Sequence, residues 1–78
     1  MPLTEEQLQE IAKKEKYLQH KEQLLEKRKA LRNDLSYAQD RVEEGLIEEE
    51  RERLAAKIRS LAAKIREIET WETEAKIG

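Results

Sequence analysis

Apolar residues in the second half of the chain recur at alternating steps of four and three residues. The run Leu-Ala-Ala-Lys-Ile-Arg at residues 54–59 is repeated one heptad later at residues 61–66. This spacing is that of the a and d positions of a heptad, the pattern of a helix that packs against another helix along a narrow seam. The pattern predicts a long helix whose seam contains Leu54, Ile58, Leu61, Ile65 and Ile68.

The first half of the chain is also predicted to be helical, but its apolar positions follow two neighbouring phases. The first phase contains Leu8, Ile11, Leu18 and Leu25. The second phase contains Tyr17, Leu24, Leu31, Leu35, Ala38 and Val42. A straight helix drifts by about 20° per heptad, so a change of phase suits packing in a bundle as well as supercoiling. Thr4 is a suitable N-cap for this helix, and Gln7 completes the pattern of a capping box.

The position of the turn decides the fold. Gly45 is the only internal glycine, and it lies where a left-handed helix C-cap would follow Glu44. The favoured prediction is one all-α antiparallel hairpin over residues 1–78. Its first helix spans about residues 4–44, its turn lies near Gly45, and its second helix spans about residues 47–75. One unbroken helix and a turn at Asn33 are the alternatives, because a glycine inside a helix costs only about 1 kcal/mol.

The apolar surface is wider than one helix–helix seam can cover. We therefore expect two hairpins to associate into a homodimer, most simply a four-helix bundle, with the two copies either parallel or antiparallel. The residues expected to carry folding and self-association are Leu24, Leu31, Leu35, Leu54, Ile58, Leu61, Ile65 and Ile68.

Composition favours long helices over a compact globular core. Charged residues make up 44% of the 78 residues, hydrophobic residues 37% and aromatic residues 4%. The absence of cysteine excludes disulfides, a thiolate nucleophile and a cysteine metal site. No segment approaches the roughly 18 to 20 consecutive apolar residues of a membrane span. The acidic N-terminal segment is not typical of a signal or transit peptide, so we expect a cytoplasmic protein with no membrane partner.

Candidate catalytic chemistry is sparse. His20 is the only histidine, and its helical neighbours Lys16, Tyr17, Gln23 and Leu24 include no carboxylate, which excludes the Glu-x-x-His pairing of di-iron bundles. There is no glycine-rich phosphate loop. We therefore predict a protein without enzymatic activity, cofactor, metal or small-molecule substrate. The predicted function is a coiled-coil protein–protein interaction module, such as a scaffold, adaptor or inhibitor, that acts as a homo-oligomer.

Charge along the chain alternates in blocks, although the net charge is only −2. Residues 13–33 and 53–66 are net positive, and the segments before, between and after them are net negative. A turn at Gly45 would bring the two positive blocks to the same height, forming a basic waist between an acidic tip and an acidic open end. Such a belt can neutralise phosphates, so the alternative function is nucleic-acid binding. The candidate anion-binding residues are Lys27, Arg28, Lys29, Arg32, Lys57, Arg59, Lys64 and Arg66.

Three short runs match parts of a known helical hairpin. They are Met-Pro-Leu-Thr at residues 1–4, Glu-Glu-Gly at 43–45 and Ile-Arg-Glu-Ile-Glu at 65–69. The outline resembles the N-terminal coiled-coil domain of Gre-type transcript cleavage factors, which implies an acidic tip and a basic patch that enter the secondary channel of RNA polymerase. The tip run of that family, Gly-Asp-Leu-Ser-Glu-Asn-Ala-Glu-Tyr, is replaced here by Gly-Leu-Ile-Glu-Glu at 45–49. The resemblance therefore contributes an RNA-polymerase-associated regulator to the alternative function and assigns no site residue.

Overall fold

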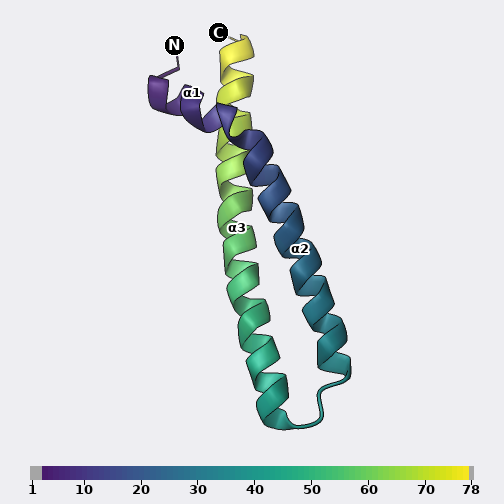
Figure 1. Ribbon diagram of the computed structural model, residues 1–78. Coiled ribbons are helices and arrows are strands. Elements are labelled where there is room, and N and C mark those ends of the chain that lie inside the picture. The colour runs from purple at the N-terminus through teal and green to yellow at the C-terminus, as the bar shows by residue number, and fades with distance from the viewer. Residues whose placement is uncertain (1–2, 78) are drawn as a thin grey trace.

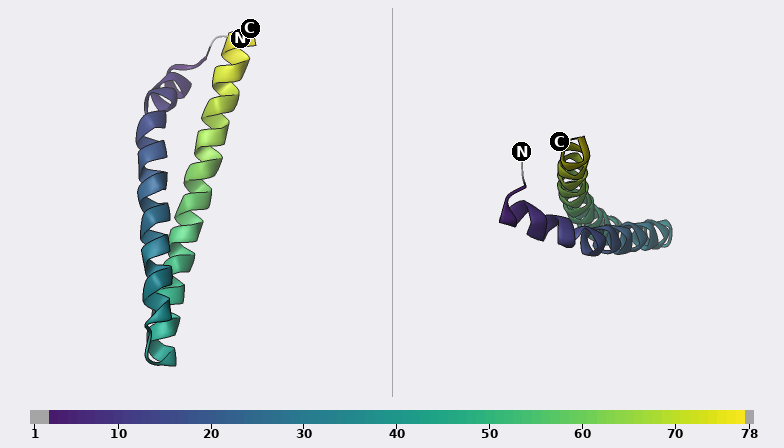
Figure 2. Two further views of the ribbon diagram at one scale, coloured as in Figure 1. Left: turned by 90° about the vertical axis from the view of Figure 1, so that its right-hand side faces the viewer. Right: turned by 90° about the horizontal axis from the view of Figure 1, so that it is seen from above.

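A computed structural model describes residues 3–77, which form three α-helices. These are α1 (Glu5–Ala12), α2 (Lys14–Ser36) and α3 (Arg41–Ile77). α2 and α3 lie side by side and antiparallel, and α1 bends away from the α2 axis at the open end of the pair (Figure 1, Figure 2). The Cα atoms extend over 57 × 18 × 15 Å. The expected all-α fold, dominated by an antiparallel helix pair, is confirmed.

The turn between the long helices lies at residues 37–40. Asp40 caps α3, because its Oδ1 accepts a hydrogen bond of 2.8 Å from the backbone N–H of Glu43. In return, Glu43 Oε2 accepts a hydrogen bond of 3.2 Å from the backbone N–H of Gln39. These two side chains satisfy backbone donors at the start of a helix, which otherwise lack partners. The Asp-x-x-Glu sequence at 40–43 therefore fixes where α3 begins.

Gly45 does not form the turn, so the predicted turn position is wrong. Gly45 lies inside α3 with a backbone that is not left-handed. The predicted helix limits, about 4–44 and 47–75, are wrong for the same reason, as are the unbroken helix and the turn at Asn33. A glycine inside a helix costs only about 1 kcal/mol, a cost comparable to what a good N-cap contributes, so the cap at Asp40 decides the boundary and α3 continues through Gly45.

The helix break at Lys13 is a feature that the sequence pattern did not predict. The backbone of Lys13 has φ −91° and ψ −1°, which ends α1 and redirects the chain into α2. α1 begins at the predicted capping box. The Thr4 hydroxyl accepts a hydrogen bond from the Gln7 N–H at 3.1 Å, and the Gln7 side chain accepts one from the Thr4 N–H at 2.9 Å.

The core is the seam between α2 and α3. The buried apolar residues are Leu24, Leu54, Ala55, Ile65 and Ile68. Half-buried positions include the other predicted seam residues, Leu31, Leu35, Ile58 and Leu61. The second of the two sequence phases is therefore the one that α2 turns toward α3. The α2 residues of the first phase lie at the surface, with Leu18 38% and Leu25 44% exposed, whereas Ile11 of the same phase is half-buried on α1.

Candidate interaction surfaces

The seam contains charged residues at regular positions. The α2 residues that are not fully exposed alternate at steps of three and four: Lys14, Tyr17, Lys21, Leu24, Arg28, Leu31 and Leu35. At the open end, Lys14 Nζ donates a hydrogen bond of 2.8 Å to Glu72 Oε1 on α3. This hydrogen bond raises the pKa of Lys14 above its usual value. Charged seam positions of this kind specify register in coiled coils.

A polar clasp of Glu10, Tyr17 and Lys64 joins all three helices. The Tyr17 hydroxyl donates a hydrogen bond of 2.6 Å to Glu10 Oε2. Lys64 Nζ lies 3.5 Å from the same oxygen and 5.3 Å from the centroid of the Tyr17 ring. The Tyr17 hydrogen bond lowers the pKa of Glu10 and raises that of Tyr17, and the charge of Glu10 raises the pKa of Lys64. The clasp therefore holds α1 against the long pair through groups that titrate.

An open groove of about 480 Å³ separates α1 from the end of α3. Its lining contains polar side chains together with Trp71, the only tryptophan of the chain. The residues that line it are Thr4, Glu6, Gln7, Gln9, Glu10, Glu67 and Trp71. No histidine, serine or cysteine lines this groove. Because Trp71 lines this groove, its fluorescence can report whether α1 is docked against α3.

The predicted basic waist is divided between different neighbourhoods. Arg28 shares a surface groove with Glu48, Arg51 and Glu52 at the start of α3. Lys64 belongs instead to the clasp at the other end of the molecule. The turn at residues 37–40 sets this register, so the candidate residues of α2 at 27–32 and those of α3 at 57–66 do not lie opposite one another, as a turn at Gly45 would have required. Of the eight predicted waist residues, only Arg28 is half-buried; the exposed ones are Lys27, Lys29, Arg32, Lys57, Arg59, Lys64 and Arg66.

Part of the predicted waist nevertheless gathers around one small hollow. This basic groove, of about 160 Å³, is lined by Leu25, Arg28, Lys29, Arg32 and Arg51. The Nε atoms of Arg28 and Arg51 are buried and have no hydrogen-bond partner within residues 3–77. Arg51 was not predicted as a site residue, because an acidic run surrounds it in the sequence. A groove lined by four cationic side chains is suited to receive a carboxylate or a phosphate oxygen.

Several large apolar side chains remain at the surface. Leu18 and Leu25 lie one heptad apart on α2, beside the seam. A second set lies around the hairpin tip, where Tyr37 is 82%, Val42 74% and Leu46 63% exposed. Isolated apolar residues at a surface need no explanation, but groups of them mark candidate contact surfaces. Leu18 and Leu25, which have the spacing of a helix–helix contact, are therefore the candidate partner surface.

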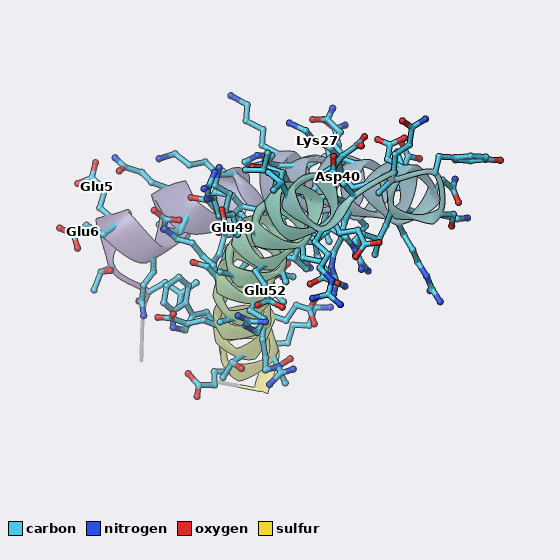
Figure 3. The ribbon with its side chains drawn as sticks, turned by 90° about the horizontal axis from the view of Figure 1, so that it is seen from below. Glu5, Glu6, Lys27, Asp40, Glu49 and Glu52 are labelled. Atoms are coloured by element: carbon cyan, nitrogen blue, oxygen red, sulfur yellow. The ribbon has the colours of Figure 1, made fainter. Side chains whose placement is uncertain are left out.

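The acidic residues of the described chain diverge rather than converge. Seen from the turn end, Glu5 and Glu6 project from α1, far from Glu49 and Glu52 on α3 (Figure 3). Across residues 3–77, no three aspartate, glutamate, histidine or cysteine side chains come together in a way that could hold a metal ion. His20 is exposed on α2. None of the helices in this part of the chain is long and apolar enough to cross a membrane.

The fold and these surfaces define an elongated all-α helical hairpin whose candidate sites are contact surfaces. Comparisons with protein-family models, curated proteins and solved structures found no match. The indications of function lie in the charges, burial and contacts of the chain's own residues.

Proposed function

We propose that this protein is a non-catalytic coiled-coil interaction module, a scaffold, adaptor or inhibitor of another protein, that acts as a homo-oligomer. The observation that carries this proposal is the exposure of Leu18 and Leu25 beside a seam that α2 and α3 have already filled. These residues continue the heptad spacing of a helix–helix contact, yet the hairpin leaves 38% of Leu18 and 44% of Leu25 exposed.

The energy available from this surface suggests reversible association. Fully burying one leucine contributes about 1.5 to 3 kcal/mol, so covering the exposed parts of Leu18 (38%) and Leu25 (44%) contributes about 1.2 to 2.5 kcal/mol per copy. Association itself costs at least about 4 kcal/mol in lost translational and rotational freedom. Contacts of the flanking lysine and arginine stems must therefore add to the leucine contribution. We expect a dissociation constant in the micromolar range or weaker.

Sedimentation equilibrium over about 1 μM to 1 mM protein tests the proposal. The average mass should rise from that of one 9.3 kDa chain toward that of two chains, while helicity by circular dichroism stays constant or increases. Elution volume alone is unsuitable, because an elongated hairpin elutes like a larger globular protein. A mass of one chain at every concentration would refute self-association.

The basic groove supports one second candidate, the binding of nucleic acid. Phosphate contacts with Arg28, Lys29, Arg32 and Arg51 would give an affinity that falls steeply with salt. Fluorescence anisotropy of labelled duplex and single strands, at low and moderate salt, tests this candidate. The charge reversal Arg28→Glu should remove binding, whereas Lys57→Glu, at an exposed lysine outside the groove, should weaken it less. Absence of binding at low salt would eliminate the candidate.

A further inference from the structure

α2 carries a second regular stripe, which we name the outer stripe. Its residues alternate at steps of three and four, and all of them are exposed: Glu15, Leu18, Glu22, Leu25, Lys29 and Arg32. Leu25, Lys29 and Arg32 also line the basic groove with Arg51 of α3, so the stripe borders the seam on the side of that groove. A helix with two adjacent heptad stripes can contact two neighbours at once. α3 occupies the first stripe, and the second is open.

The charges of the outer stripe distinguish its two ends. The acidic residues Glu15 and Glu22 lie toward the start of α2, and the basic residues Lys29 and Arg32 lie toward its end. In a parallel pairing of two copies, every one of these charges would face its own counterpart. In an antiparallel pairing centred between Leu18 and Leu25, Leu18 of each copy faces Leu25 of the other copy. Glu15 of each copy then faces Lys29 of the other. Opposite charges placed across an interface select orientation and partner.

We propose that two copies of this chain associate through the outer stripe of α2, antiparallel, with the two-fold axis passing close to Glu22. The proposal rests on the self-association proposed above. It adds which face of α2 makes the contact and how the two copies are oriented. The acidic half of the outer stripe in one copy, Glu15 and Glu22, then lies toward the basic groove of the other. Glu15 brings a carboxylate toward the side where the buried Nε atoms of Arg28 and Arg51 have no partner within residues 3–77.

The two-fold axis places one unfavourable contact at the centre. Glu22 of each copy lies near Glu22 of the other, and like charges across an interface oppose association. The variant Glu22→Gln removes this repulsion and keeps the size of the side chain. We therefore expect Glu22→Gln to associate more tightly than the unchanged protein in sedimentation equilibrium. A weaker dimer in this variant would contradict the proposed face.

Cysteine cross-linking tests the orientation, and the chain has no native cysteine to interfere. Glu15→Cys and Lys29→Cys are made as separate variants, mixed, and oxidised at a concentration where the unchanged protein is dimeric. The antiparallel pairing predicts a disulfide between the two variants in the mixture and little cross-linking of Lys29→Cys alone. Efficient cross-linking of Lys29→Cys alone, with none between the variants, would overturn the antiparallel orientation.

The double variant Leu18→Gln with Leu25→Gln tests the face. Both leucines are partly exposed in the hairpin, so helicity should change little. The dissociation constant should rise at least about tenfold, because a two-fold interface loses each contact twice. Leu46→Gln is the matched control, since Leu46 is 63% exposed on α3 and should leave the dissociation constant unchanged. An unchanged dimer in the double variant would refute the proposed face.

A charge exchange provides a test that does not depend on the leucines. Lys29→Glu should weaken the dimer, and adding Glu15→Lys to the same chain should restore it, because the pair then has reversed charges. Damage to folding would not be repaired by the second substitution. If the unchanged protein is monomeric throughout, the proposed self-association fails. If the unchanged protein is dimeric but the charge exchange does not restore dimerisation, the proposed face and orientation fail and self-association itself stands.

Discussion

Replacing Gly45 by alanine tests the placement of the turn. The structure predicts that this substitution stabilises the protein. Gly45 lies within α3 and has no left-handed backbone. Apart from the adjacent residues and the backbone of its own helix, a Cβ atom built at this position would meet no atom within 4 Å, so the new methyl group causes no strain. Alanine is favoured over glycine in a helix interior by about 0.8 to 1.0 kcal/mol. Gly45→Ala should therefore raise the free energy of unfolding by about that amount.

The increase is large enough to measure in a chain of this size. For a domain of 60 to 100 residues, 1 kcal/mol shifts Tm by about 4 to 8 °C. Thermal melts by circular dichroism at one fixed protein concentration measure the shift without interference from changes in self-association. Urea titrations of the two proteins should give different midpoints with the same slope, because the surface exposed on unfolding is unchanged.

The opposite sign would refute the assignment of the turn. If Gly45 formed a left-handed cap between two helices, a Cβ atom there would cost about 1 to 2 kcal/mol. Gly45→Ala would then lower Tm by several degrees. Ser60→Ala is a suitable control, since Ser60 is an exposed residue in the interior of the same helix. It measures the general gain from alanine in α3, which should be no more than about 0.7 kcal/mol.

Three further predictions follow from the observed contacts. Asp40→Ala removes the cap of α3 and should lower the free energy of unfolding by about 0.5 to 2 kcal/mol in the same melts; no loss would contradict the cap. Ile68→Ala, at a residue with 0% exposure, should cost about 2 to 5 kcal/mol, and a cost below 1 kcal/mol would contradict its place in the core. The pKa of Glu10 is lowered below its usual 4.5, so its support for α1 is present above pH 4.5 and lost as the pH falls below it. The pKa of Tyr17 is raised above its usual 10.0, so its support is present below pH 10.0 and lost as the pH rises beyond it. Trp71 emission should therefore change at both extremes, and Tyr17→Phe should flatten both changes; an identical profile in that variant would contradict the clasp.

The helices themselves could be predicted from the sequence because their signals are local. The repeat at 54–66 places apolar residues on one face, and the capping box at Thr4 and Gln7 marks a start that the structure confirms. Within α2 the two apolar phases separate in the structure, since Leu24, Leu31 and Leu35 face α3 while Leu18 and Leu25 lie at the surface. Which phase would be covered could not be decided locally, because the answer depends on where α3 lies.

The turn and the break at Lys13 depended on other kinds of information. The Asp-x-x-Glu sequence at 40–43 is a local capping signal for the turn, whereas the prediction of a turn at Gly45 rested on the single internal glycine. At Lys13 no proline or glycine interrupts the helix pattern. Before this break, α1 is held in place by contacts of Glu10 with Tyr17 of α2 and Lys64 of α3. Contacts between distant parts of the chain are not visible in a local pattern.

The register of the hairpin explains why charged residues occupy its seam. Because residues 54–59 and 61–66 are identical, sliding α3 by one heptad would present α2 with nearly the same apolar surface there. A slip of one heptad moves the helices by about 10 Å, which would separate Lys14 from Glu72. The four residues at 37–40, pinned by the Asp40 cap, would also have to span that added distance. The heptad repeat at 54–66 therefore supplies packing that registers shifted by one heptad would nearly reproduce. The Lys14–Glu72 ion pair and the capped turn select one of these registers.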